Sequence, residues 1–535
     1  MAHADEIAKL ARQPFTIIKL ELDNTISDGG AEYHCHGRSP LGQLFYSSIP
    51  ENGFDPTPTR MAVGSGLGFR GTVRVTFDDF AFGGAGTYFG RLLAANPYYL
   101  DRLIKVYDGF YDGVTFDWAN FKERLYFIKK IDGPDSKGKV TIQAADLLTL
   151  LDEDQAQTPT TPNAKLASTL AIGATGTINI GDNTDFSASG GIAQINDEFV
   201  AYSGVSGGTS IVITARAQYG TEAEEHDADD AVSPCYSYSA QNVVDVIYDL
   251  IDQFSPIDVS TYINLTGWEA ERDNYLVGDS VTGIVPAGTP IKDKIEKLCQ
   301  QAMASVWWDD EDQEIKIKAV GPSITPSANL NKDQHILDKG EQPKRDPSKA
   351  ITEVWVYYGR KNHAKDEEKP SNYSALYVTP DADATAGHGK RKIHTIFAED
   401  IPASGTSTVN KISARLLSQF AQGENTYKFQ LDVKDSGVKT GQLVDITTDT
   451  IQGVDGLPTT NSFLVLERDR IGPTVYQYTA QSTGFTTGAP YRLIAPNSLA
   501  SDYTAASAAQ RAKYAFVADT VSEEFSNGDP AHLIL

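Results

Sequence analysis

This sequence of 535 residues has few cysteines and no long apolar run. Its three cysteines, Cys35, Cys235 and Cys299, are scattered and odd in number, which argues against a disulfide framework and suits a reducing cytoplasm. No apolar stretch approaches the ~18 residues that cross a bilayer, and the opening MAHADEIAKLARQ lacks the apolar segment of a signal peptide. We therefore expect no membrane insertion and a protein that stays in the compartment where it is translated.

Positive charge is also scarce in this chain. It has 46 Lys and Arg against 71 Asp and Glu, which gives a formal net charge of −25. This charge balance argues against a broad phosphate-binding surface and therefore against stable nucleic-acid binding. An ordinary role in keeping the protein soluble explains the acidic charge equally well. The length exceeds what one hydrophobic core fills, so we expect three or more domains.

Strand patterns are abundant, and they are clearest in residues 101–151. Short β-branched and aromatic blocks at 103–107 and 125–128 are closed by Asp-Gly turns, and residues 139–144 alternate polar with apolar. Asp146 is then placed to cap a short Leu-rich helix. Earlier segments complete the region, with strands predicted over 15–22, 32–36 and 71–77, helices over 5–12 and 88–99, and a long loop over 39–65. Together they predict a compact antiparallel barrel domain over residues 14–151.

A similar block of strands returns near the C-terminus. Residues 427–433 alternate strictly, Gly441 opens a strand over 443–446, and two more strands follow. A strand over 354–358 is predicted to start this second barrel, and a helix over 409–420 precedes its main block. We expect a second, related barrel domain over 346–483 and an extended arm over 484–535.

The order of strands and turns in the two blocks resembles the hub proteins at the tail tip or baseplate of bacteriophages and phage-like particles. In that family, two barrel domains of each chain alternate around a trimer to make a ring of six. The resemblance implies a virion structural protein, assembled as a homotrimer in the host cytoplasm. It would join the distal tail or tail tube protein above to a central fibre or tip protein below. Genome DNA would pass through the ring along an acidic wall, and no reaction or cofactor is required.

Between the two blocks, residues 152–237 and 238–345 form two further predicted domains. The first is entered through an acidic and Thr/Pro-rich linker and consists of short strands and Gly turns, which is typical of an inserted small β domain. The second carries amphipathic helices over 241–254 and 291–303 and then a hairpin. The fold class predicted is mainly β with α+β parts: two related small β-barrel hub domains, a helix-hairpin α/β domain between them, and the inserted β domain.

The insert contains the residues that most suggest chemistry. Asp197, Glu198 and Tyr202, followed by Arg216 and His226, resemble a module found in several phage tail proteins. This chain departs from that module at 196 and 217, where it has Asn and Ala in place of the expected Gly. His226 beside two carboxylates suggests acid/base chemistry, but no nucleophile or second base accompanies it. We interpret the group as carboxylates and a histidine closing a turn with Arg216.

The remaining candidate sites also have structural interpretations. His34 and His36 share a strand face, but a metal site needs three or four ligands. The glycines of 64–71 precede a strand and lack the Lys-Ser/Thr of a phosphate loop, and the acids of 309–312 lack a calcium loop's Gly and Glu. The acids are predicted to form a charged hairpin tip, free to lie wherever water reaches, and the basic run 390–392 a turn facing solvent or protein. We assign no catalytic, cofactor-binding or metal-ligating residue and expect no enzyme activity.

Two alternatives belong to other functional classes. A tail-associated peptidoglycan hydrolase would need a paired acid and base or a Cys-His arrangement, and neither stands at convincing spacing. A carbohydrate-binding surface protein would also be β-rich and aromatic, like this chain with its 25 Tyr and 22 Phe. Zymography tests the first alternative and glycan-array binding the second.

Overall fold

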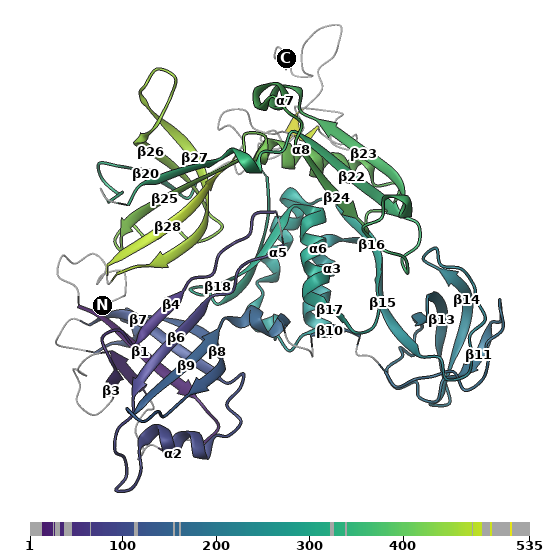
Figure 1. Ribbon diagram of the computed structural model, residues 1–535, viewed down its shortest axis with the longest axis horizontal. Coiled ribbons are helices and arrows are strands. Elements are labelled where there is room, and N and C mark those ends of the chain that lie inside the picture. Colours follow the sequence, from purple (N-terminus) through teal and green to yellow (C-terminus); the bar gives the residue numbers. More distant parts are fainter. Residues whose placement is uncertain are drawn as a thin grey trace, which may run out of the picture. The chain divides into compact units, whose positions relative to one another are not determined.

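Figure 1 shows the computed structural model of the chain, a mainly β protein with a few helices. The structure describes residues 13–24, 26, 33–36, 45–64, 66–111, 116–152, 156–159, 162–321, 326–337, 340–472, 474–483, 493–494 and 514–515. The helix predicted over 5–12 and almost all of the predicted arm lie outside these residues. Within the arm, β29 (Leu493–Ile494) and β30 (Tyr514–Ala515) pair in parallel. In the described part of the chain, no helix is long and apolar enough to cross a membrane.

The first large sheet has eight strands in the order β3-β2-β1-β7-β8-β9-β6-β4. They are β1 (Gln13–Glu21), β2 (Tyr33–His36), β3 (Tyr46–Ile49), β4 (Phe54–Thr57), β6 (Thr72–Asp78), β7 (Leu103–Tyr111), β8 (Phe121–Asp132) and β9 (Lys139–Ala145). The alternation in β9 places Val140 and Ile142 in the core, where α2 (Tyr88–Ala95) buries its apolar face. The 3₁₀ helix Leu147–Asp152 follows, and Asp146 Oδ1 accepts a hydrogen bond from Leu148 N at 3.1 Å, which confirms the predicted cap.

The second large sheet has six strands in the order β20-β26-β27-β28-β25-β21. They are β20 (Ala328–Asn331), β21 (Gln342–Asp346), β25 (Glu424–Asp432), β26 (Leu443–Gln452), β27 (Pro458–Arg470) and β28 (Val475–Ser482). Tyr427, Phe429 and Leu431, which alternate in the sequence, are buried together in its core. This confirms the strands predicted for the second block.

The two sheets place corresponding strands in the same order. In chain order the strands β1, β4, β6, β7, β8 and β9 lie as β1-β7-β8-β9-β6-β4, and the strands β20, β21, β25, β26, β27 and β28 lie as β20-β26-β27-β28-β25-β21. In each sheet the last three strands form a meander, flanked on one side by the first strand and on the other by the third. The sheets differ in that β1 is antiparallel to β7 whereas β20 is parallel to β26. The recurrence seen in the sequence is therefore a recurrence of topology.

A β-bulge occurs at the same place in both meanders. In the first sheet Ile128 pairs with Ala144 and Lys130 with Gln143, so Lys129 is the extra residue of β8. In the second sheet Val465 pairs with Ala480 and Glu467 with Thr479, so Leu466 is the extra residue of β27. A bulge bends its strand and increases the local twist. Both sheets are therefore curved at the same point of the same strand.

The turn that enters the meander also recurs. Asp101 N donates to Ile128 O at 2.8 Å, and Gly441 N donates to Val465 O at 2.8 Å. Both donors have positive φ, +60° at Asp101 and +83° at Gly441. Gly adopts this conformation freely, and Asp tolerates it better than most other residues. The two blocks thus share strand order, bulge position and entering turn, which supports their description as related units.

Neither large sheet closes into a barrel. Among the described residues, the end strands β3 and β4 of the first sheet do not pair with each other, nor do β20 and β21 of the second. The predicted closed barrels are wrong in this respect. In the first sheet, Pro56 of the edge strand β4 has no N–H to donate to a further strand.

The strand over 354–358 belongs to neither large sheet. It is part of β22 (Glu353–Arg360), which lies between β23 (Tyr373–Pro380) and β24 (Ile393–Ala398) in a separate three-stranded sheet. The helix α8 (Thr406–Phe420) follows these strands and buries Val409 and Ile412. Two shorter helices, the 3₁₀ helix Pro370–Asn372 and α7 (Ala382–His388), lie between the three strands in the sequence. The prediction that this strand starts the second barrel is wrong, because its strand-like pattern does not specify its partners.

A central region lies between the strand blocks in the chain. Its largest elements are α3 (Val243–Phe254), α5 (Leu265–Tyr275), α6 (Ile291–Ala302), β16 (Ser280–Val285) and the hairpin of β18 (Ala304–Asp309) with β19 (Glu314–Ala319). They share one large apolar core. The helices over 243–254 and 291–302 and the hairpin confirm the sequence predictions. The helices α4 (Val259–Tyr262) and α5 were missed, since α5 is largely polar and buries only Trp268.

The glycines of 64–71 allow close packing of backbone against this central region. The strand β5 (Gly66–Leu67) pairs in parallel with β18. A Cβ on Gly68 would lie 2.8 Å from Trp307 Cβ, and one on Gly66, whose φ is +115°, would lie 3.1 Å from Glu296 Cα. The glycines therefore have a packing role in the structure.

The insert forms its own apolar core around short strands. They are β11 (Gly176–Asn179), β12 (Gly191–Ile195), β13 (Glu198–Ser206) and β14 (Ser210–Gln218), with β15 (Val232–Asn242) continuing the sheet towards β16. Ile195, Val200 and Ile213 are among the residues buried in it. His363 N, from the loop after β22, donates to Tyr219 O at 3.1 Å. The run of short strands and Gly turns confirms the sequence pattern, while the domain boundaries stay a prediction.

Candidate functional site

The tip of the β18–β19 hairpin meets both large sheets. Arg124 of β8 lies 3.3 Å from Asp310, Arg468 of β27 pairs with Glu311, and Lys439, just before β26, pairs with Asp312. Burial raises the pKa of Asp310. Burial also raises the pKa of Glu311, but the charges of Arg468 and Arg124 outweigh it and hold that pKa below its usual value.

The hairpin tip itself was predicted correctly, but not its surroundings. Asp309 is buried, and Lys316 Nζ lies 3.0 Å from its Oδ2. The expectation that these acids lie free in water is wrong, because Lys316 of the same hairpin and cations from distant strands pair with them. The tip is an ionic junction between the central hairpin and the two sheets.

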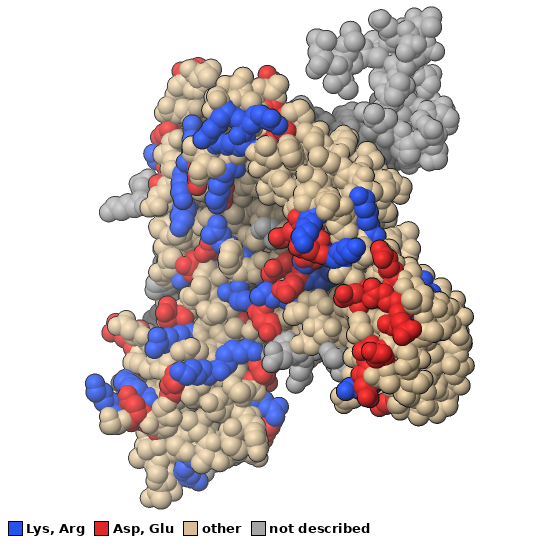
Figure 2. Space-filling model, turned by 45° about the vertical axis from the view of Figure 1, so that its right-hand side comes forward, with Lys and Arg blue, Asp and Glu red and all other residues tan. Residues whose placement is uncertain are grey.

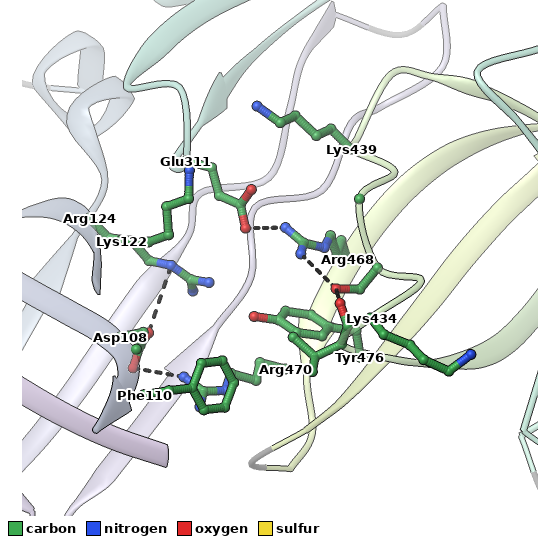
Figure 3. A pocket seen from close by; sticks show the side chains of 14 residues that line it. Asp108, Phe110, Lys122, Arg124, Glu311, Lys434, Lys439, Arg468, Arg470 and Tyr476 are labelled. Atoms are coloured by element: carbon green, nitrogen blue, oxygen red, sulfur yellow. Dashed lines mark hydrogen bonds and ion pairs between the residues drawn. The ribbon is translucent and has the colours of Figure 1, made fainter. Parts of the chain in front are cut away.

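A pocket of about 430 Å³ opens at this junction (Figure 3). One wall comes from β7 and β8 and the other from β27, β28 and the loop that precedes β26. Its lining includes six cations, two carboxylates and two aromatic rings: Lys122, Arg124, Lys434, Lys439, Arg468, Arg470, Asp108, Glu311, Phe110 and Tyr476. No motif in the sequence indicates this pocket, because its walls are more than 300 residues apart in the chain.

Asp108 links the two walls of this pocket. Its Oδ1 lies 3.0 Å from Arg470 Nη1 and accepts a hydrogen bond from Thr16 Oγ1 at 2.8 Å. Its Oδ2 lies 3.8 Å from Arg124 Nε. One buried carboxylate thus serves two guanidinium groups, one from each sheet, as the dashed lines of Figure 3 mark.

The insert brings together Glu198, Arg216 and His226. The Arg216 guanidinium donates to both oxygens of Glu198, at 2.7 and 2.6 Å, and the ring of His226 lies 2.9 Å from Oε2. The amides of Ala217 and Glu224 also donate to this carboxylate. Burial raises the pKa of Glu198, but the hydrogen bonds from Arg216 and His226 outweigh it and lower the pKa to about 2.

This arrangement supports the turn-closing interpretation of the insert motif. The predicted fourth member, Asp197, is exposed and stays outside the group. Asn196 and Ala217, where the resemblance led us to expect Gly, both have positive φ, at +52° and +57°. Both positions are therefore left-handed in this chain; Asn tolerates that conformation better than most residues, so the strain falls mainly on Ala217.

We expect Glu198→Gln to destabilise the insert, because Arg216 would keep its charge at a buried site with no carboxylate beside it. The folded-state pKa of about 2 lies below the ordinary 4.5, so this carboxylate stabilises the fold above pH 4.5 and progressively less as pH falls towards 2. At neutral pH the loss is on the order of 3 kcal/mol, or a hundredfold faster amide exchange across β13 and β14. Hydrogen exchange read by mass spectrometry checks this, with Asp197→Asn as the matched control. Equal exchange in both variants would contradict it.

Of the two histidines that the sequence analysis considered and rejected as metal ligands, only His34 has a described side chain. His34 is buried among Tyr46, Phe77, Tyr88 and Phe89, and its Nδ1 lies 2.7 Å from Ser48 Oγ. Burial lowers the pKa of His34 to about 3. The side chain of His36 lies outside the described residues. Within the described ranges, no three His, Cys, Asp or Glu residues are grouped to hold a metal.

The basic run 390–392 faces solvent and neighbouring protein, as expected. Lys390 is exposed, Arg391 pairs with Glu353 on β22, and Lys392 Nζ donates to Pro347 O. On the face drawn in Figure 2, Lys and Arg lie in separate groups interspersed with Asp and Glu. That face carries no continuous basic surface.

A buried ionic cluster around Lys294 was missed from the sequence. Lys294 Nζ lies 2.7 Å from Glu399 Oε1 and 2.8 Å from both oxygens of Asp400. Arg360 Nη1 lies 2.6 Å from Glu399 Oε2, and Tyr238 Oη donates to Asp400 at 2.7 Å. The available signal was the position of Lys294 on the apolar face of α6, one turn from Ile291 and Leu298.

No protein-family model and no curated protein sequence matches this chain. Solved structures that it resembles include several tail proteins. A tail protein from Neisseria meningitidis MC58 is 10% identical, with a TM-score of 0.41, over 88% of this chain and 98% of that one. The 43 kDa tail protein of prophage MuSo2 from Shewanella oneidensis is 9% identical, with a TM-score of 0.40 and the same coverage. Prophage tail protein gp18 from Listeria monocytogenes is 9% identical, with a TM-score of 0.33, over 88% of this chain and 94% of that one. None of the three reaches a TM-score of 0.5, so the likeness is distant.

Proposed function

We propose that this chain is a virion structural protein, the trimeric hub of a phage tail tip or baseplate. The observation that carries the proposal is the repeated sheet, with its shared strand order, bulge and entering turn. A chain with two equivalent units can match a six-fold tube when three copies close around one axis. The resemblance of both strand blocks to tail hub proteins points to the same arrangement.

In this role each copy contributes two equivalent units to a ring. The hub joins the distal tail or tail tube protein above to a central fibre or tip protein below. Genome DNA passes through the ring without being held, in keeping with the net charge of −25. The particle is assembled in the host cytoplasm, the insert over 152–237 lies on its outside, and the arm over 484–535 docks on another chain.

The ionic junction at the hairpin tip would hold the two sheets of each copy rigid within such a ring. Arg124 of the first sheet and Arg468 of the second both pair with the central hairpin, through Asp310 and Glu311. Buried pairs with several partners fix geometry because an uncompensated charge in the interior is costly. Each copy would therefore enter the ring with its two sheets held at a set separation.

Native mass spectrometry of the purified protein tests this proposal. We expect a species of three chains, and six similar density units around the axis in electron microscopy of tail tips. A chain that stays monomeric when purified and within particles would overturn the proposal, as would a ring whose units show no six-fold pseudo-symmetry.

A further inference from the structure

The pocket between the two sheets concentrates cations in a strongly acidic protein. Six Lys and Arg side chains line it against two carboxylates, while the whole chain has 46 Lys and Arg against 71 Asp and Glu. The cations come from both walls, with Lys122 and Arg124 on one side and Arg468 and Arg470 on the other. The chain as a whole has the opposite balance, with more acidic than basic side chains.

Five of the six cations already pair with carboxylates of this chain, through Asp108, Asp310, Glu311, Asp312 and Asp435, and several guanidinium donors remain for a ligand. Asp108 is shared between Arg124 and Arg470. Arg124 Nε is buried and has no hydrogen-bond partner, in a side chain that is only 12% exposed. Lys122 is exposed and, among the described residues, has no ion pair. A further carboxylate group in the pocket would satisfy donors that are already in place.

The pocket also offers apolar contact beside its charges. Phe110 and Tyr476 line it, and the Arg468 guanidinium stacks 4.2 Å from the centre of the Tyr476 ring. Arginine forks bind carboxylates through paired hydrogen bonds, and aromatic walls favour an apolar neighbour next to the anion. A short peptide with carboxylates on both sides of an apolar side chain matches both features.

The size of the pocket separates peptides from duplex DNA. A volume of about 430 Å³ falls in the range of small-ligand sites and accommodates a few side chains. A DNA duplex, whose major groove alone is about 12 Å wide, does not enter such a space. The pocket is thus shaped for a short segment rather than for a nucleic-acid surface.

We propose that this pocket binds a short acidic peptide segment of another protein, with Arg124, Arg468 and Arg470 receiving its carboxylates. The bound segment contacts both sheets at once, so its binding depends on the junction between them. This inference rests on the lining of the pocket and stands whether or not the chain is a tail hub.

Calorimetric titration of the full-length protein with a capped peptide, Glu-Glu-Phe-Glu-Glu, tests the proposal. We expect binding that weakens between low salt and about 0.15 M salt. The matched peptide with Gln in place of Glu should bind at least tenfold more weakly. Lys122→Ala combined with Lys434→Ala should weaken binding about fivefold to tenfold, because both cations stand at the rim and contribute modestly. Both side chains are exposed, so the fold should be unaffected.

Lys130→Ala is the control, since Lys130 is an exposed cation on the same strand but outside the pocket. Equal weakening in this variant, equal binding of the Gln peptide or no peptide binding at all would overturn the proposal. Inorganic phosphate and a short DNA duplex are titrated in parallel. Binding of either probe as tightly as the acidic peptide would also overturn it, and sub-micromolar, salt-sensitive binding of the duplex would mark a nucleic-acid site instead.

Discussion

Lys294→Met is expected to lower the free energy of unfolding by about 3–5 kcal/mol, the cost of leaving a buried charge without its partner. Lys294 is 6% exposed and is the cation shared by Glu399 and Asp400, which are 6% and 1% exposed. In the variant, Glu399 keeps Arg360 and Asp400 keeps Tyr238 and Gln301, but the pair of carboxylates loses the charge between them. Denaturant unfolding followed by tryptophan fluorescence measures the loss, and hydrogen exchange of α6 localises it.

The matched control for this variant lies on the next turn of the same helix, α6. Lys297 of α6 pairs with Glu367, but both side chains are more than a third exposed. Lys297→Met should therefore cost less than about 1 kcal/mol. The same loss in both variants would contradict the assignment of Lys294 as the centre of the cluster.

The pH dependence of this effect has a definite sign. Burial raises the pKa of Glu399, but the charge of Lys294 outweighs it and holds that pKa well below the ordinary 4.5. The stabilisation is therefore fully present above pH 4.5 and is lost as pH falls towards the folded-state pKa. In Lys294→Met, acid instead neutralises carboxylates that lack their cation. The difference in the free energy of unfolding between wild type and variant should thus become smaller below about pH 4.5.

Strand periodicity predicted the parts of the fold that depend on local pattern. Val140 and Ile142 in β9, and Tyr427 and Phe429 in β25, alternate with polar neighbours because one face of each strand is buried. The edge strand β4 was not predicted and lies within the loop expected over 39–65, because it contains Pro56 and has only four residues. Pattern thus indicates a strand, but neither its length nor its position in the sheet.

Pairing across long distances could not be predicted in the same way. The strand β22 has the composition of a barrel strand, yet its partners are β23 and β24, and nothing in its own residues specifies them. The acids of the hairpin tip read as solvent-exposed because their cations, Arg124 and Arg468, lie about 150 residues or more away in both directions. The pocket formed there depends entirely on that distant pairing, so no local motif marks it.

The hairpin between β26 and β27 is the segment whose substitution best tests how copies of this chain contact each other. Val454 is fully exposed and Leu457 is 63% exposed, so two large apolar side chains stand close together on one turn. In the first sheet, the matching end of the meander, where β7 meets β8, supplies Asp108 and Arg124 to the junction with the second sheet. In a ring of equivalent units, the β26–β27 end would contact the first sheet of the next copy in the same way.

We therefore expect the double variant Val454→Asp with Leu457→Asp to prevent assembly of the proposed trimer while leaving the fold of the single chain intact. Each junction would lose the burial of two apolar side chains, about 1.5–3 kcal/mol apiece, and would gain two desolvated carboxylates. Native mass spectrometry at micromolar protein should then show the single chain, with a circular dichroism spectrum unchanged from that of the wild type. Ile172→Asp is the control, since Ile172 is 68% exposed on the insert, away from the proposed contact, and should leave three chains together. A double variant that remains trimeric would place the contact between copies elsewhere, and equal dissociation of the Ile172 variant would show that added charge alone separates them.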